Sequence, residues 1–96
     1  MTEWKNIKVA DEKVCRWLAD DPRLIDLICF VASYTSKPLR LEIYHDYEEN
    51  FEELHIVVET DEELEDYIDE WKMLTEELVG RFPRDLRAKV GVLYGK

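Results

Sequence analysis

The fold is decided by residues 39–59, which read LRLEIYHDYEENFEELHIVVE. Apolar and polar residues alternate on both sides of a polar centre, which is typical of two β-strands joined by a turn. One face of each strand is apolar, and the residues on this face are Leu39, Leu41, Ile43, Leu54, Ile56 and Val58. We therefore expect a hairpin whose turn spans residues 46–52.

The hairpin register follows from keeping the two apolar faces together. A pairing of Leu41 with Val58 satisfies this condition, because directly opposed residues lie on the same face of a sheet. The same register pairs Arg40 with Glu59 and so brings opposite charges together. We take this register as our prediction.

Two helices are expected before the hairpin. Residues 10–19 carry apolar side chains at helical spacing, and the triplet Asp20-Asp21-Pro22 then provides a helix start signal. The second helix, ending near Ser36, is apolar on two sides, and its second stripe consists of Ile25, Cys29 and Ala32. Such a helix must be covered on more than one side, so we expect a homodimer, and the alternative is a monomer in which the two helices form a tight hairpin.

A longer helix and a third strand are expected after the hairpin. Thr60–Glu63 fits a capping box, and Gly80 is the expected C′ residue of a helix that runs to about Val79. The predicted core stripe of this helix is Leu64, Tyr67, Ile68, Trp71, Leu74 and Leu78. Residues 88–94 alternate as a strand, which a helical crossover sets parallel to the second strand. The expected fold is α+β: a two-layer sandwich in the order ααββαβ, with helices on one face of a three-stranded mixed sheet.

Length and composition limit the class of protein. A chain of 96 residues with 46% hydrophobic residues, three Gly and three Pro is expected to form a single domain over residues 1–96. No run approaches the ~18 apolar residues of a membrane span, and the first residues lack a signal-peptide core, so we expect a cytoplasmic protein. The absence of Gln and the presence of only two Asn favour a thermophilic source.

The charge is concentrated in one part of the chain. The net charge is −10, and residues 42–77 contain sixteen acidic residues and one basic residue, whereas residues 78–96 contain one acidic and five basic residues. Such a surface repels phosphate groups, which disfavours nucleic acids and anionic membranes as partners. We expect a non-enzymatic interaction protein that binds a basic protein partner through residues 42–77, with Glu65 and Asp69 among the binding residues.

An alternative function rests on the polar side chains of the hairpin. The alternation puts Tyr44, Asp46, Glu53 and His55 on one face of the sheet, where carboxylates and an imidazole could bind a divalent cation or exchange a proton. His45 falls on the other face. No phosphate-binding loop or nucleophile motif is present, since the three glycines are isolated, so we predict no catalytic residue and no cofactor.

The cysteines and tryptophans allow simpler interpretations. If the two N-terminal helices fold back at Pro22, Cys15 and Cys29 face each other and can form a disulfide, whereas the alternative is two small buried thiols. Trp17 and Trp71 lie on apolar stripes and are expected in the core. Trp4 is expected to anchor the N-terminal arm.

The segments Leu41–Asp46 and Leu54–Thr60, followed by a helix bearing Trp71 and a last strand, are similar to small uncharacterised acidic proteins of prokaryotes with a ββαβ pattern. The resemblance covers residues 39–94. It implies a fold, and it implies no activity, cofactor or site residue.

Overall fold

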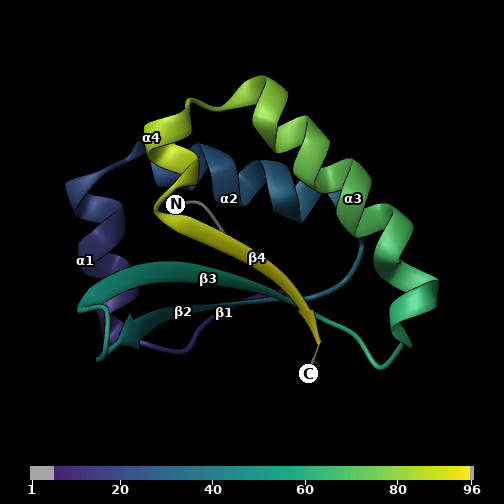
Figure 1. The fold of residues 1–96 in the computed structure, drawn as a ribbon, viewed down its shortest axis with the longest axis horizontal. Helices are drawn as coiled ribbons and strands as arrows, with labels where there is room; N and C mark the ends of the chain where they lie inside the picture. Colours follow the sequence, from purple (N-terminus) through teal and green to yellow (C-terminus); the bar gives the residue numbers. More distant parts are fainter. Residues whose placement is uncertain (1–5, 96) are drawn as a thin grey trace.

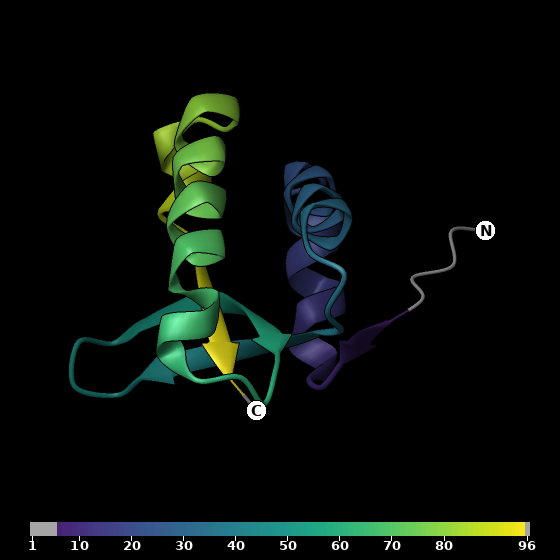
Figure 2. The same cartoon turned by 90° about the vertical axis from the view of Figure 1, so that its right-hand side faces the viewer.

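The computed structural model describes residues 6–95, and Figure 1 shows how its elements follow one another. In chain order these are β1 (Ile7–Val9), α1 (Glu12–Asp20), α2 (Arg23–Tyr34), β2 (Leu39–Asp46), β3 (Phe51–Glu59), α3 (Leu64–Arg81), α4 (Arg84–Arg87) and β4 (Val90–Gly95). Figure 2 shows α2 and α3 on the same side of a four-stranded sheet. The predicted α+β class is confirmed, but the predicted three strands and the order ααββαβ are wrong.

The strand order across the sheet is β1-β2-β3-β4. β2 and β3 form the antiparallel hairpin at the centre, β1 lies parallel to β2, and β4 lies parallel to β3. The parallel placement of the last strand is therefore confirmed. β1 is the strand that the sequence pattern does not reveal, because three residues are too few to show an alternation.

The hairpin register differs from the predicted one by two residues. Leu41 pairs with Ile56 rather than with Val58, and Arg40 pairs with Val57. A shift of two residues leaves every side chain on its predicted face. Arg40 therefore still reaches Glu59, and its Nη1 lies 3.1 Å from Glu59 Oε2 along the diagonal of the ladder.

A short turn accounts for this register. The turn occupies residues 47–50, so both strands extend further than predicted. Asn50 has a φ of 53°, a left-handed conformation that asparagine tolerates better than most residues. The Asp46 carboxylate accepts hydrogen bonds from the backbone N–H groups of Glu48 and Glu49, at 3.0 and 3.1 Å. These bonds tighten the turn from within.

The helices before the hairpin break where predicted. Asp11 caps α1 by accepting a hydrogen bond from the Lys13 N–H at 2.9 Å, and Pro22 directly precedes α2. α2 packs on the sheet through Leu24, Leu27, Ile28 and Val31, which are all buried. Two of the three residues of its second stripe are not covered within residues 6–95, since Ile25 is 36% exposed and Cys29 is exposed, whereas Ala32 packs against the core.

The two cysteines are free and exposed. Cys15 and Cys29 both lie on outward sides of their helices, so the predicted disulfide is absent from the structure and the alternative of two buried thiols is also wrong. Trp17 and Trp71 are partly buried against the core, as expected. Trp4 lies outside the described residues.

α3 begins later and ends later than predicted. Thr60 Oγ1 accepts a hydrogen bond from the Glu62 N–H at 3.1 Å, which shapes the approach to the helix rather than its first turn. Gly80 lies inside the helix and has no positive φ, so its predicted role as the C′ residue is wrong. The helix stops at Arg81 because Pro83 follows closely, and α4 then adds one short turn.

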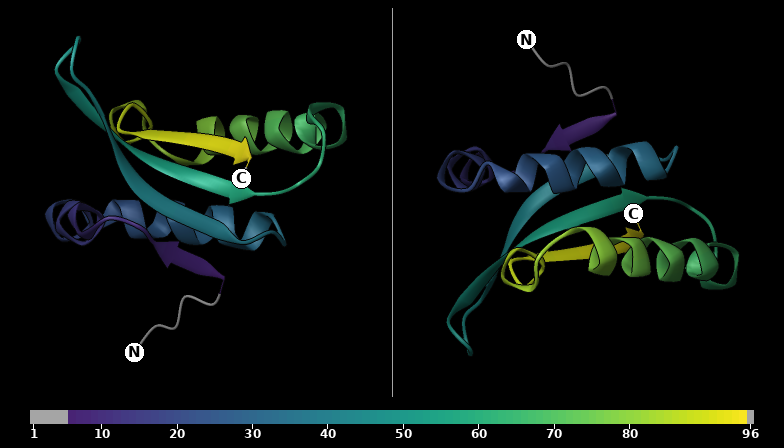
Figure 3. Two further views of the ribbon diagram at one scale, coloured as in Figure 1. Left: turned by 90° about the horizontal axis from the view of Figure 1, so that it is seen from below. Right: turned by 90° about the horizontal axis from the view of Figure 1, so that it is seen from above.

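The hydrophobic core lies between the sheet and the helices. Its buried members are Val14, Leu24, Leu27, Ile28, Val31, Leu39, Leu41, Leu54, Ile56, Val58, Leu74, Leu78, Leu86 and Tyr94. α3 contributes only two of these residues from its 18, whereas the 12 residues of α2 contribute four. Figure 3 shows α2 over the β1 and β2 side of the sheet and α3 over β4.

Candidate functional site

Three of the predicted hairpin residues meet on the open face of the sheet. His55 Nε2 lies 2.8 Å from Glu53 Oε1, and the Tyr44 ring stacks on the imidazole with centroids 5.0 Å apart and planes 4° from parallel. The His55 side chain is 16% exposed and that of Glu53 is 29% exposed. The three side chains therefore form a partly shielded cluster of a carboxylate, an imidazole and a phenol ring.

Gly91 makes the space for this pair. It lies beside His55 in the parallel ladder between β3 and β4. A Cβ atom at this position would lie 2.6 Å from Glu53 Oε1 and 3.2 Å from His55 Cδ2. Any larger residue would therefore displace the Glu53 carboxylate from the imidazole.

The other predicted site residues lie elsewhere. The Asp46 carboxylate is engaged in the hairpin turn, and His45 is on the opposite face, where its Nδ1 is 3.5 Å from Glu52 Oε2. Glu65 and Asp69 are exposed on α3, in the helical layer on the other side of the sheet. Within residues 6–95, no group of three His, Cys, Asp or Glu side chains has the geometry to hold a metal ion.

Three acidic residues of the hairpin pair with neighbouring lysine or arginine side chains. Arg40 pairs with Glu42 and Glu59, at 3.5 and 3.1 Å. Glu52 pairs with His45 and with the Lys13 ammonium, at 3.5 and 3.4 Å, and these contacts hold the pKa of the Glu52 carboxyl below its usual range. The hairpin therefore has less unbalanced negative charge than its composition indicates.

The acidic residues of α3 differ from those of the hairpin. Glu65, Asp69 and Glu76 follow one side of the helix, and none of them has an ion pair within the part of the chain that the structure describes. We call these three residues the acidic rim. Residues three and four apart are neighbours on a helix, so the exposed Lys72 lies within this strip, between Asp69 and Glu76. The rim is therefore a strip of net negative charge that contains one cation.

An incompletely covered apolar strip runs beside the rim. We call it the α3 flank, and its residues follow a helical spacing: Leu64, Ile68, Trp71, Thr75 and Val79. Leu64 is 55% exposed and Val79 is 54% exposed, and Ile68 is not part of the core cluster. The prediction that Leu64 and Ile68 belong to the core stripe is therefore wrong, because the helix turns them past the edge of the sheet.

Two adjoining hollows follow the α3 flank. One, of about 440 Å³, is lined by Ile68, Trp71, Lys72, Thr75 and Glu76. The other, of about 280 Å³, is lined by Leu27, Thr75, Leu78, Val79, Arg87, Val90 and Val92. Thr75 lines both hollows, so they adjoin at this residue: the first lies along α3 alone, and the second lies between α3 and β4. We call the two hollows together the groove. Sequence reasoning missed this groove, although the spacing of Thr75 and Val79 with Leu64 continues the strip.

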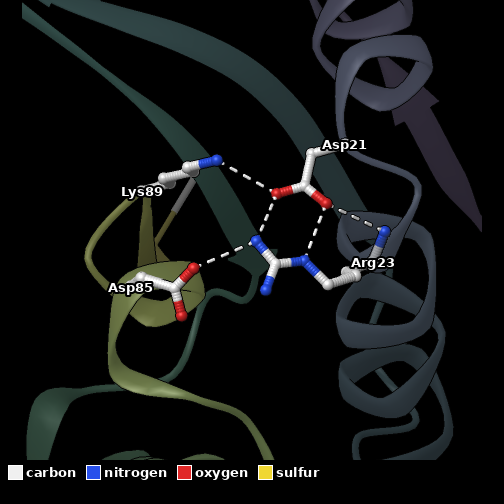
Figure 4. Close-up of polar contacts among 4 residues, drawn as sticks. All are labelled: Asp21, Arg23, Asp85 and Lys89. Carbon is white, nitrogen blue, oxygen red and sulfur yellow. Dashed lines mark hydrogen bonds and ion pairs between the residues drawn. The ribbon is translucent and has the colours of Figure 1, made fainter.

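A cluster of four charged residues connects the start of α2 with α4 and the residue before β4 (Figure 4). The Arg23 guanidinium binds Asp21 through two hydrogen bonds of 2.9 Å and donates a third, of 3.1 Å, to Asp85. Lys89 Nζ lies 3.0 Å from Asp21 Oδ2. The hydrogen bonds from Arg23 and Lys89 hold the pKa of the Asp21 carboxyl well below its usual range. The four charges balance one another, so we interpret the cluster as a structural tie rather than a ligand site.

A second polar group positions the start of α3. Lys37 Nζ lies 3.1 Å from Glu62 Oε1 and 3.6 Å from Glu70 Oε2. Although partial burial opposes the charge, these two carboxylates raise the pKa of the Lys37 ammonium. The Tyr94 hydroxyl donates a hydrogen bond to Glu70, and burial followed by this carboxylate raises the Tyr94 pKa above its usual value. The N-terminal half of α3 is therefore held firmly on β4.

Comparison with known proteins gives no match to a protein family, to a curated protein or to a solved structure. None of the helices described for residues 6–95 combines the length and the apolar character needed to cross a bilayer.

Proposed function

We propose that this protein is a cytoplasmic, non-enzymatic interaction protein that binds a basic protein partner through its acidic region, residues 42–77, with α3 as the main contact. The observation that carries the proposal is the arrangement on α3, where the exposed apolar flank runs beside the acidic rim. An apolar strip bordered by charge is the usual composition of a protein-binding surface.

The charges of α3 favour a basic partner. None of Glu65, Asp69 and Glu76 is in an ion pair within residues 6–95, and Lys72 beside them offsets one of the three charges, so the rim stays net negative and attracts a cationic partner. Met73, which is 58% exposed, lies on the same stretch of the helix and offers a flexible apolar contact. The hairpin contributes longer-range attraction, since some of its carboxylates are already paired.

A peptide titration tests the proposal. The probe is a short synthetic peptide, KKVTVTVKK, and its control carries glutamate in place of every lysine. We expect calorimetry to detect binding of the lysine peptide only, and the affinity to fall steeply as salt rises from low to physiological ionic strength. Equal binding of both peptides, or binding that does not respond to salt, would contradict the proposal.

Matched variants locate the contact. The triple substitution Glu65→Gln, Asp69→Asn and Glu76→Gln removes the acidic rim with little change in shape. The control triple, Glu12→Gln, Asp20→Asn and Asp26→Asn, removes the same charge from exposed positions outside residues 42–77. We expect the rim variant to lose about tenfold or more in affinity for the lysine peptide and the control to lose about threefold or less.

Self-association is a second part of the proposal. It rests on the outward side of α2, where Ile25 is 36% exposed beside the exposed Cys29. A second copy would cover this side. Sedimentation equilibrium at micromolar concentration, under reducing conditions, is expected to show a dimer that the substitution Ile25→Asp dissociates, whereas a monomer at all concentrations would contradict it.

A small metal-binding protein or enzyme centred on Asp46, Glu53 and His55 is the alternative function. The 2.8 Å contact between Glu53 and His55, under the stacked Tyr44 ring, is the observation that favours it. Calorimetric titration with calcium, magnesium, manganese and zinc tests this function. Heats that are the same for the wild type and for the variant Asp46→Ala and His55→Ala would reject a metal site.

A further inference from the structure

β4 presents a free backbone edge. It is the outermost strand, and β3 is its only neighbour within residues 6–95. The Leu54 N–H donates to the Lys89 carbonyl at 2.8 Å, and the Thr60 N–H donates to the Gly95 carbonyl at 2.9 Å. Since the backbone groups of a strand alternate in direction, the odd-numbered residues face β3, and Val90, Val92 and Tyr94 direct their N–H and C=O groups away from the sheet.

This edge carries none of the features that usually prevent strands from pairing. The six residues of β4, VGVLYG, include no charged side chain and no proline. The opposite edge of the sheet is β1, which has only three residues, with Lys8 at its centre. The sheet is therefore protected at one edge and open at the other.

An added strand beside β4 would lie beneath apolar side chains of α3. Figures 2 and 3 show α3 running directly above β4, so one side of the helix extends past the edge of the sheet. The α3 flank lines the hollows on this side, together with Val90 and Val92. Side chains that point upward from an added strand would meet Ile68, Trp71 and Thr75. A fifth strand would thus gain both backbone hydrogen bonds and apolar contacts.

The position of α3 decides which kind of strand fits. If β4 of a second copy paired with β4, the two α3 helices would lie about 4.8 Å apart, which is the spacing of neighbouring strands. Packed helices need about 8–10 Å between their axes. The occupant must therefore be a strand with no helix above it. Lys72 and Arg87 also line the hollows, but α3 has six acidic and two basic residues. Its net charge of −4 favours a segment that carries lysine or arginine, whose long stems can cross the flank.

We infer that β4 receives an extended segment of the basic partner as a fifth strand of the sheet, with its apolar side chains against the α3 flank and its cationic side chains at the acidic rim. The inference rests on the proposed function and adds the mode of binding. Three outward-facing residues on β4 allow up to about six backbone hydrogen bonds with an antiparallel segment.

Backbone methylation of the probe separates strand addition from charge attraction. The peptide KKVTVTVKK is compared with versions that carry N-methyl groups on alternate central residues, in the two alternate patterns. All three have the same charge, but in one pattern the methyl groups fall on the N–H groups that would pair with β4. We expect that version to bind about tenfold or more weakly and the other to bind within about threefold.

A substitution in the protein provides the second arm of the test. Val92→Pro removes an outward N–H and leaves the bonds to β3 in place, as proline permits on the free side of an edge strand. Val92→Ala keeps the N–H but also shortens the side chain, so it measures the contribution of the side chain alone. We expect Val92→Pro to bind the lysine peptide about tenfold more weakly than Val92→Ala does, and equal affinities of the two variants would contradict strand addition.

The outcomes distinguish the two proposals. If the three peptides bind equally to the wild type but the acidic-rim variant weakens all of them, strand addition is overturned and charge-driven docking stands. If no lysine peptide binds, both are overturned. If Val92→Pro fails to fold, as judged by circular dichroism, the methylated peptides still decide the question.

Discussion

The two halves of the molecule have the same connectivity but differ in how many helical residues they bury and in their outer strands. Each half is a pair of parallel strands connected by helix: β1 to β2 through α1 and α2, and β3 to β4 through α3 and α4. In the first half the covering helix buries four residues, and the outer strand is short and bears a lysine. In the second half the longer helix buries two residues, and the outer strand is longer and uncharged.

The two halves therefore use their apolar residues in different ways. The first half covers its own strands, so its apolar residues act chiefly in folding. The second half keeps an apolar strip and a strand edge that folding does not use, which is typical of a surface that another polypeptide completes. The rim residues Glu65, Asp69 and Glu76 are in no ion pair within residues 6–95, whereas Glu42, Glu52 and Glu59 of the hairpin are paired.

The largest effect is expected when equivalent isoleucines of the two halves are truncated. Ile28 on α2 is fully buried, so Ile28→Ala is expected to lower the free energy of unfolding by about 2–5 kcal/mol. Ile68 on α3 lies outside the core cluster, so Ile68→Ala is expected to cost about 1 kcal/mol or less. Urea denaturation measures both values, and equal losses would remove the contrast between the halves.

The second-largest effect on the free energy of unfolding is expected from a pair of proline substitutions on β4. Leu93 directs its N–H toward β3, so Leu93→Pro breaks a ladder bond and is expected to cost about 3 kcal/mol of unfolding free energy. Val92→Pro leaves the ladder intact and is expected to cost clearly less. Thermal unfolding followed by circular dichroism gives the comparison. If Val92→Pro destabilises the protein as much as Leu93→Pro, the outer edge of β4 is not free.

A smaller effect is expected at the cluster that joins the halves. Arg23 and Lys89 hold the Asp21 pKa below its usual value, so the ionised carboxylate stabilises the fold above about pH 4, and this stability is lost as the pH falls below that value. Asp21→Asn is expected to lower the melting temperature by a few degrees at pH 7. The difference in melting temperature between the wild type and this variant is expected to narrow below pH 4. Asp20→Asn, one residue away, is the control. A difference in melting temperature that stays constant down to pH 2 would contradict the role of Asp21.

The smallest change in stability is expected at the protected edge. Lys8→Val leaves the unfolding free energy within about 0.5 kcal/mol, because the side chain is exposed. It removes the charge from β1, however, so we expect association beyond that of the wild type, which light scattering detects. Lys13→Val on α1 adds similar apolar surface away from an edge and is expected to scatter light as the wild type does. No difference between these two variants would mean that Lys8 does not protect β1.

Local patterns in the sequence predict much of the fold. The hairpin, the break at Pro22 and the parallel last strand follow from alternation and cap residues, which act over a few positions. β1 and α4 cannot be predicted in this way, because three or four residues are too few to show a hydrophobic periodicity. The register also escapes it, since a shift of two residues preserves both faces and only the turn, with Asn50 in a left-handed conformation, selects between them.

The candidate site depends more on tertiary structure. Tyr44, Glu53 and His55 could be grouped from the sequence because they share one face of a hairpin. The groove could not, because it depends on where α3 lies relative to the sheet. The apolar residues of α3 cover more than one side of the helix, and the sequence does not tell which of them meet the sheet. The pairing of the hairpin carboxylates with Lys13 and Arg40 is likewise a tertiary effect that charge counts do not show.

The connectivity of the sheet also bears on the order in which it assembles. β2 and β3 are joined by a turn of residues 47–50, and hairpins of this kind close within about 1–10 μs. β1 and β4 can pair only after longer loops have closed, at a greater cost in chain entropy. We therefore expect the sheet to nucleate at its centre and to grow outward by adding one parallel strand on each side. Binding at β4 would then extend the same growth by one more strand, supplied by another chain.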